Sequence, residues 1–338
     1  MNNKNATLSS GFRQGLPRWQ HLVSPHWVAC LAAGDPVTAA PAGNWRLLEI
    51  GFNAMSAYLR GHIPGARYVD TTEFEHGPLW NKVADVVLVD LLLSYGIRHD
   101  TTVIVYARDP LAAARAAHLM LYAGVEDVRL LDGGHGAWTK LHFPLERGLP
   151  PRLPAASDFG VHVPAHPEYL VNMCQVRKLL AQPDACLVSI RTWNEFIGKT
   201  SGYSYIPAKG DIAGALWGRS GSDDDVNSVS EFHDAHGRMR VDSEIRRMWK
   251  AKGIRPDRHT IFYCGTGWRA SLAFFHAWLM KWERISLYDG GWCEWSRDPS
   301  NPVVRRVDAS YERFRSNLDD EQTGSPVPCI PIPLRDWD

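Results

Sequence analysis

The chain has 338 residues, of which 45% are hydrophobic and 22% charged, a composition typical of a soluble globular protein long enough for two domains. Lysine plus arginine and aspartate plus glutamate both total 37, so the charge gives no sign of a surface for nucleic acid or for anionic membranes. No apolar run approaches the length of a membrane span, and residues 1–20 are polar and lack an apolar signal segment.

The six cysteines are scattered through the chain, without the close Cys and His spacing that zinc sites use. This pattern argues against a structural metal and against a disulfide scaffold, so we expect no metal and a reducing, cytoplasmic setting. The cysteines stand at positions 30, 174, 186, 264, 293 and 329.

The first half of the chain alternates short apolar strands with helices. Short apolar runs predict strands at 22–24, 47–50, 102–106 and 128–131. Runs without glycine or proline predict helices at 27–33, 88–95 and 111–123. The alternation is typical of an α/β fold, with a mainly parallel sheet flanked by helices.

The second half repeats the first, and from Tyr106 to Trp138 the offset between the two copies is constant. Asp132 and Asp289 each open an Asp-Gly-Gly-x-x-x-Trp segment, and Tyr106 corresponds to Tyr263 without a gap. The Gly-His-Ile-Pro-Gly-Ala segment at 61–66 corresponds to 210–215. Two copies indicate a tandem duplication of one domain. We expect a flexible tail at 1–18, domains at 19–147 and 168–300, a proline-rich linker at 148–167 and a C-terminal extension at 301–338.

Cys264 follows an apolar run at 260–263 that predicts a buried strand. Gly265 and Gly267 allow a tight turn, and residues 268–280 predict a helix. The first N–H groups of such a helix have no partner inside it and attract an anion, which favours a thiolate at this cysteine. The pattern therefore predicts a nucleophilic cysteine in an anion-binding loop. The alternative interpretation is a small buried hydrophobic residue at the end of a strand.

The first copy lacks this chemistry. Ala107 stands where the second copy has Cys264, and Pro110, which has no N–H group, stands where it has Gly267. The first domain is therefore predicted to be catalytically silent, and this asymmetry argues against a purely structural Cys264.

Together these motifs resemble those of tandem-domain rhodaneses, which are two-domain sulfurtransferases. The resemblance covers roughly residues 20–300 and includes the loop cysteine, the Asp-Gly-Gly turns and the Leu-Val-x-x-Arg strand that ends at Arg191. It implies two rhodanese-like domains, with Cys264 as the catalytic residue of the second. It further implies transfer of sulfane sulfur from a small anionic donor, thiosulfate, to a thiol or cyanide through a Cys264 persulfide, without a cofactor. The donor-binding residues that it implies are Arg191, Gly265, Thr266, Gly267, Trp268 and Arg269.

Two residues depart from the family pattern, and the loop after Cys264, in which Trp268 and Arg269 fit neither group of donors, leaves the donor open. Ser189 stands where the family often has an acidic residue, and the second copy reads Gly-Asp-Ile, with Asp211 in place of histidine. The loop begins with Gly-Thr-Gly, as in 3-mercaptopyruvate sulfurtransferases, which are the alternative. Arg269 in the first helical turn opposes the helix dipole and is expected to meet an anion, which favours thiosulfate slightly.

Two other classes of protein were considered. A cysteine phosphatase uses a Cys-x5-Arg loop, but Arg269 follows Cys264 after four residues, so the loop is one residue too short to wrap a phosphate. A non-catalytic rhodanese-like binding module is disfavoured by the intact cysteine in its loop.

Overall fold

The computed structural model describes residues 12–13 and 15–307, which form two five-stranded sheets, each wholly parallel. The first sheet has the order β1 (Leu22–Val23), β7 (Val128–Leu131), β6 (Thr102–Ala107), β2 (Trp45–Gly51), β3 (Arg67–Asp70). The second has the order β8 (Leu170–Val171), β13 (Ile285–Tyr288), β12 (His259–Tyr263), β9 (Ala185–Ser189), β11 (Leu216–Trp217).

The two sheets have the same topology, strand for strand. Each places the strand before the candidate loop, β6 or β12, in the middle. On one side of it lies the strand that leads into the Asp-Gly-Gly turn, β7 or β13, and on the other side lies β2 or β9. The predicted α/β fold class, with two tandem domains and mainly parallel sheets, is confirmed.

Helices flank both sheets. The first domain contains α2 (Pro25–Ala32), α3 (Met55–Arg60), α4 (Asp85–Ser94), α5 (Pro110–Ala123) and α6 (Gly134–Lys140). The second contains α7 (Met173–Leu180), α8 (Trp193–Phe196), α9 (Asp242–Lys250), α10 (Trp268–Leu279) and α11 (Gly291–Trp295). Within the described residues, no helix combines the length and the apolar character that crossing a membrane requires.

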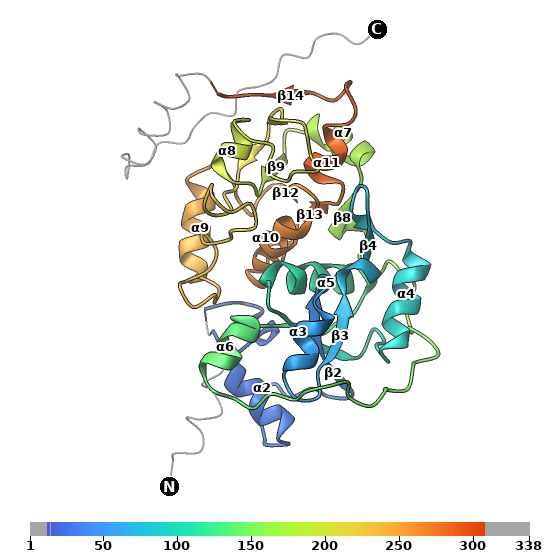
Figure 1. Ribbon diagram of the computed structural model, residues 1–338. Helices are drawn as coiled ribbons and strands as arrows, with labels where there is room; N and C mark the ends of the chain where they lie inside the picture. Colours follow the sequence, from blue (N-terminus) through green and yellow to red (C-terminus); the bar gives the residue numbers. More distant parts are fainter. Residues whose placement is uncertain (1–11, 14, 308–338) are drawn as a thin grey trace.

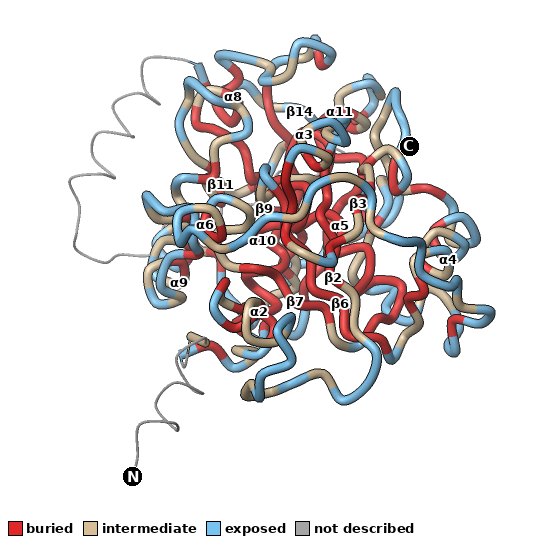
Figure 2. The backbone as a smooth tube through the Cα atoms, turned by 60° about the horizontal axis from the view of Figure 1, so that its bottom comes forward, coloured by how far each residue is buried: buried red, intermediate tan, exposed pale blue. Residues whose placement is uncertain are grey.

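Helices α5 and α10 lie side by side at the centre of the molecule, one from each domain (Figure 1). Every residue of α5 after Pro110 is buried, and alanines at six of these positions let the two helices approach closely. The ring of His118 on α5 lies 4.6 Å from that of Phe274 on α10, edge to face. One hydrophobic cluster therefore runs through both domains, as the buried centre in Figure 2 shows.

The described parts of the predicted tail and extension are held by contacts with the domains. Arg13 donates two hydrogen bonds to Asp132, and Leu16 is buried. Beyond residue 300, β14 (Val303–Val304) pairs antiparallel with β10 (Asp211–Ile212). The rest of the tail and extension, residues 1–11, 14 and 308–338, lies outside the described residues. The predicted domain boundaries stay predictions.

The Asp-Gly-Gly turns explain why the repeat keeps its second glycine. Gly134 and Gly291 both have a left-handed backbone, with φ of 54° and 52°. A Cβ at Gly134 would lie 2.5 Å from the carbonyl oxygen of Ala107, and one at Gly291 would lie 2.6 Å from that of Cys264. In both domains the turn thus lies directly against the loop that follows the middle strand, and only glycine fits.

Replacing Gly134 by alanine should lower the free energy of unfolding by about 1–3 kcal/mol, because it adds a strained left-handed residue and a close contact with Ala107. Gly136→Ala is the matched control, since its Cβ would meet nothing within 4 Å in the same helix α6, and we expect it to be neutral or slightly stabilising. Urea unfolding measures both. Equal effects of the two variants would contradict the prediction.

Candidate active site

Cys264 lies directly after β12, the middle strand of the second sheet, and directly before the turn into α10. The backbone N–H of Gly267 donates a hydrogen bond to its sulfur over 3.2 Å. Gly267 has φ of 97°, a left-handed conformation that brings this N–H round toward the cysteine. The predicted strand–cysteine–turn–helix arrangement is therefore present, and the sulfur lies at the N-terminal end of a helix.

The Asp-Gly-Gly turn holds this loop from the neighbouring strand. The N–H of Trp292 donates to the carbonyl of Cys264 over 2.8 Å, and the N–H of Cys293 donates to that of Gly265 over 3.0 Å. These two bonds satisfy the carbonyls of Cys264 and Gly265 and tie the start of the loop to the turn. The loop is thereby rigid where Cys264 joins it.

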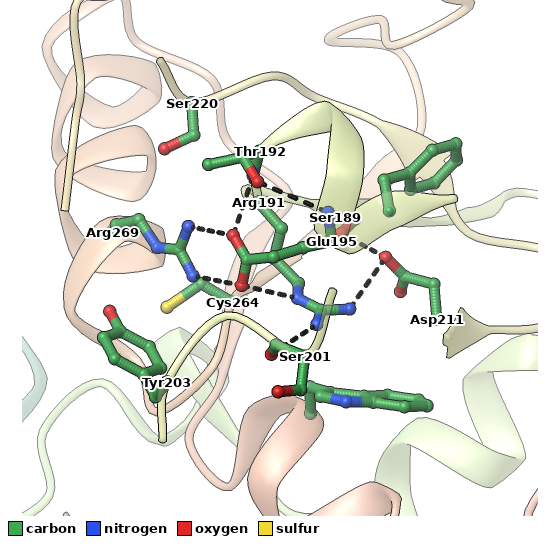
Figure 3. A network of polar contacts seen from close by, with 12 residues as sticks. Ser189, Arg191, Thr192, Glu195, Ser201, Tyr203, Asp211, Ser220, Cys264 and Arg269 are labelled. Atoms are coloured by element: carbon green, nitrogen blue, oxygen red, sulfur yellow. Dashed lines mark hydrogen bonds and ion pairs between the residues drawn. The ribbon is translucent and has the colours of Figure 1, made fainter. Parts of the chain in front are cut away.

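Arg269 lies in the first turn of α10 and is fully buried. Its guanidinium forms a bidentate pair with Glu195, with Nη1–Oε2 at 2.6 Å and Nη2–Oε1 at 3.0 Å (Figure 3). The sequence predicts an anion beside Arg269. Glu195 of α8 is such an anion, and it belongs to the chain itself.

Arg191 is also fully buried and shares the same carboxylate. Its Nε donates to Glu195 over 3.3 Å, and its Nη1 donates to the carbonyl of Gly210 over 2.7 Å and to Asp211 over 3.2 Å. The guanidinium also lies over the ring of Trp292, 5.1 Å from the centroid. Two arginines and two carboxylates thus form one network beside Cys264 (Figure 3).

The charge of Glu195 is strongly stabilised in this network. Burial by itself would raise the pKa of Glu195, but Arg269 and Arg191 outweigh burial and lower it to about 2. The two positive and two negative charges cancel, so the network adds no net charge to the site. Binding of a donor by Arg191 or Arg269, like binding by residues 265–268, stays a prediction; in the structure both guanidinium groups are bonded within the chain.

Asp211 accounts for both departures from the family pattern. Its carboxylate accepts hydrogen bonds from Ser189 Oγ over 2.8 Å and from the hydroxyl of Tyr263. In the first domain the hydroxyl of Tyr106, the repeat partner of Tyr263, donates instead to Glu49 over 2.7 Å. The second domain has therefore kept a buried acid for this tyrosine, but supplies it from β10, whereas the first domain supplies it from β2.

Two stacked tyrosines cover the loop. The rings of Tyr203 and Tyr205 lie 5.3 Å apart, and a Cβ on Gly265 would lie 2.5 Å from the Tyr203 ring. Tyr203 also lies next to the Arg269 guanidinium (Figure 3). Beneath these rings Cys264 has no exposed surface. Burial raises the pKa of Tyr205 to about 12, against the effect of its hydrogen bond with Thr266, so its hydroxyl is protonated at neutral pH.

The first domain fills the corresponding site with its own side chain. Arg108, next to Ala107, donates to Glu49 over 2.9 Å and to the carbonyl of Gly61 over 2.5 Å. Pro110 occupies the first position of α5, where the missing N–H is one that the helix leaves free in any case. That position corresponds to Gly267, whose N–H bonds the sulfur of Cys264. The structure thus supports a silent first domain by two separate features.

Sequence reasoning missed Glu195, Asp211, Tyr203 and Tyr205. Glu195 was detectable in part, because Thr192 and Glu195 have the spacing of a capping box, and both bonds of that box are present. Asp211 was noticed only as a departure from the family pattern. No local signal in the sequence marks Tyr203 or Tyr205 as residues that cover the loop.

Replacing Glu195 by glutamine should lower the free energy of unfolding by about 3–5 kcal/mol near neutral pH, because two buried guanidinium groups lose their counter-charge. The lowered pKa means that the carboxylate stabilises the fold above its unfolded pKa of about 4.5 and that this stabilisation is lost as the pH falls toward about 2. The difference between wild type and Glu195→Gln should therefore shrink on acidification.

Urea unfolding at about pH 7, 4.5 and 3 measures this difference. The control is Glu244→Gln, which breaks a surface pair with Arg240 at 3.7 Å and should cost less than about 1 kcal/mol. A difference between wild type and Glu195→Gln that stays constant from pH 7 to 3 would count against the charged network.

Comparison with known proteins identifies the family. The rhodanese-like domain family matches the chain twice, at residues 43–141 and 173–298. The protein YnjE of Escherichia coli, named a thiosulfate sulfurtransferase, is 55% identical over 291 residues, which are 86% of this chain and 66% of YnjE. The sulfur carrier protein TtuD of Thermus thermophilus is 24% identical over 265 residues, 77% of this chain and 90% of TtuD. The chain spans about two thirds of the length of YnjE.

Solved structures agree with this assignment. The crystal structure of YnjE has a TM-score of 0.84 and 54% identity, covering 87% of this chain and 70% of that one. The anaerobic ergothioneine biosynthesis enzyme from Chlorobium limicola, solved with its natural substrate trimethyl histidine, has a TM-score of 0.83 and 37% identity, covering 87% and 72%. With two matching domains, the repeated topology and the cysteine loop, the chain belongs to the rhodanese family as a tandem-domain member.

Proposed function

We propose that this protein is a sulfurtransferase that moves sulfane sulfur from thiosulfate to a thiol or cyanide through a persulfide on Cys264. The observation that carries the proposal is the hydrogen bond from the Gly267 N–H to the sulfur of Cys264 at the start of α10. A thiolate is the nucleophile in such exchange reactions, and this N–H and the helix dipole favour the thiolate. The name of YnjE, at 55% identity, supports the same activity.

The proposed reaction has two steps. The Cys264 thiolate attacks the outer sulfur of thiosulfate, the S–S bond of the donor breaks, and sulfite leaves with the electron pair. A second thiolate, or cyanide, then attacks the outer sulfur of the persulfide and releases the Cys264 thiolate. The loop assists both steps, because the Gly267 N–H stabilises the Cys264 thiolate that attacks in the first step and is released in the second.

The donor is proposed to contact the loop residues Gly265 to Trp268. Arg191 and Arg269 are proposed to act on it from within their network, since Glu195 and Asp211 already bond their guanidinium groups. Because Cys264 has no exposed surface, a donor reaches it only after Tyr203 and Tyr205 move. 3-Mercaptopyruvate is the alternative donor, consistent with the Gly-Thr-Gly start of the loop.

Incubation with thiosulfate should add one sulfur atom to the peptide that contains Cys264, as measured by mass spectrometry of the intact protein and its peptides. Cys264→Ser should be folded and lose the added sulfur together with cyanide-dependent turnover. Cys174→Ser, which changes an exposed cysteine on α7, is the control and should retain both. Persulfide on any other cysteine, or turnover by Cys264→Ser, would refute the proposal.

The same assay with 3-mercaptopyruvate distinguishes the donors, and a rate more than about tenfold above that with thiosulfate would favour the alternative.

A second candidate acceptor is hercynine, the trimethylated histidine of the ergothioneine pathway. EanB, a protein of known structure that is 36–37% identical to this chain, has been solved in complex with hercynine, as a cysteine persulfide with ergothioneine, and as variants of one tyrosine and one threonine. Measured from that cysteine, the tyrosine and the threonine have the same spacing in the chain that Tyr205 and Thr266 have from Cys264. In this protein the Tyr205 hydroxyl is hydrogen-bonded with Thr266 and lies near Cys264.

Further aromatic rings lie beside Trp268, at the end of the loop. The ring of Phe52 lies 5.7 Å from that of Trp80 and 6.2 Å from that of Trp268, and Phe52 is 46% exposed. Aromatic faces bind planar rings and quaternary ammonium groups, and hercynine has both. In this reaction the ring carbon would take the outer sulfur of the persulfide, and its proton would pass to the released thiolate.

Protein loaded with persulfide and mixed with hercynine should form ergothioneine, detected by mass spectrometry. Tyr205→Phe should slow this reaction by at least about tenfold, because it removes a protonated hydroxyl beside the loop, while transfer to cyanide changes little. Tyr122→Phe, which removes a hydroxyl that bonds Asp85 in the first domain, is the control and should have no effect. Absence of ergothioneine with an intact persulfide would exclude this acceptor.

A further inference from the structure

Arg115 lies in the middle of α5, in the silent first domain, and its side chain is fully buried. It is the only residue of this fully described helix with a full charge at neutral pH, since burial lowers the pKa of His118 to about 4. The constant offset of the repeat places Leu272 at the corresponding position of α10. The repeated fold therefore does not require an arginine here, and its contacts must explain it.

The guanidinium of Arg115 connects the two domains. Its Nε donates to Glu75 over 2.9 Å, and its Nη2 donates to Asp289 over 2.6 Å. Glu75 belongs to the hairpin β4 (Glu75–His76) and β5 (Asn81–Lys82) of the first domain, whereas Asp289 opens the Asp-Gly-Gly turn of the second. The other oxygen of Asp289 accepts the N–H of Lys82 over 2.8 Å. The first domain thus bonds both oxygens of Asp289.

The same cluster reaches the loop that follows Cys264. The indole N–H of Trp268 donates to the free oxygen of Glu75. Next to Trp268, a Cβ on Gly267 would lie 3.2 Å from Nη1 of Arg115, and this nitrogen has no hydrogen-bond partner among the described residues. Gly267 is the residue whose N–H bonds the sulfur of Cys264. Arg115 therefore packs directly behind the turn that presents this N–H.

The contact between Arg115 and Asp289 acts on the start of the loop, at Cys264. Asp289 precedes the turn whose N–H groups, at Trp292 and Cys293, bond the carbonyls of Cys264 and Gly265. A shift of Asp289 would move this turn, and with it the start of the loop. Arg115 consequently fixes both ends of the segment from Cys264 to Trp268, one through Asp289 and the other through Glu75.

We propose that Arg115 is a positioning residue for Cys264, supplied by the catalytically silent domain, which holds the loop in the conformation that points the Gly267 N–H at the sulfur. The inference rests on the proposed function only in taking Cys264 as the nucleophile. The charges of Arg115, Glu75 and Asp289 stabilise one another, so the three side chains form one cluster. Burial raises the pKa of Glu75 to about 7 even with Arg115 beside it, so loss of the guanidinium would convert Glu75 to its protonated form and would leave Asp289 without its buried counter-charge.

The test compares Arg115→Met with Arg129→Met. Arg129 is the matched control, because it is a buried arginine of the same domain, paired with Asp127 at 2.6 Å and lying over the ring of Trp27, without a contact to the loop. Both variants remove a buried guanidinium from an ion pair, so both should lose stability, which urea unfolding measures. Only Arg115→Met should slow persulfide formation from thiosulfate, by at least about tenfold, with a change in kcat rather than in KM alone.

Amide hydrogen exchange gives a readout that does not depend on sulfur transfer. The peptide that spans 264–268 should exchange at least about tenfold faster in folded Arg115→Met than in wild type, and unchanged in Arg129→Met. Faster exchange would support the positioning role even if wild-type protein formed no persulfide. The absence of persulfide in wild type would refute the proposed function but not the positioning role. Wild-type exchange and wild-type kinetics in folded Arg115→Met, or equal losses in both variants, would overturn the inference.

A second variant covers the case in which Arg115→Met does not fold. Arg115→Lys keeps the charge but can no longer bond Glu75 and Asp289 with two separate planar N–H groups. We expect persulfide formation and loop exchange to lie between those of wild type and Arg115→Met. A folded Arg115→Lys identical to wild type in both measurements would show that charge alone suffices and would overturn the geometric role.

Discussion

The hydrogen bond from the Gly267 N–H to the sulfur of Cys264 is the contact on which the site depends. It forms only if three loop residues keep their conformation, and contacts from several elements hold them. The turn at Gly291 bonds the loop carbonyls, the Tyr203 ring lies on Gly265, and Glu195 fixes the first turn of α10 through Arg269. The charged side chains around the loop are paired with one another, so the backbone is what the site offers to an anion.

Most of the fold could be predicted from the sequence, because its signals are local or repeated. The strand before Cys264, the two glycines and the helix after them are adjacent in the chain, and each has a physical meaning of its own. The repeat, which aligns Asp132 with Asp289, predicted two domains of the same kind, one after the other in the chain. The identical strand orders of the two sheets confirm it. The start of the first helix was predicted two residues late, at residue 27, because Ser24 was expected in the strand, whereas it caps α2 with Pro25 in the first turn.

The partners of the ionised residues could not be predicted, because they depend on which distant segments meet in space. Arg191 and Arg269 were recognised as cations near the site, but nothing in the chain between them identifies Glu195 as their common counter-ion. The exchange of Glu49 for Asp211 is a similar case. The acid that supports the central tyrosine comes from a different strand in each domain, and only the three-dimensional arrangement shows that the two are equivalent.

Because of Arg115, one copy of the duplicated domain cannot take the place of the other. In a chimera in which a second copy of the catalytic half replaced the first half, leucine would stand opposite Asp289, as Leu272 does in α10. The carboxylate would keep no guanidinium in an interior where an unpaired charge costs several kcal/mol. The two copies share a topology, yet they are no longer exchangeable parts. The ancestral symmetry was lost in the packing between the domains as well as at the cysteine.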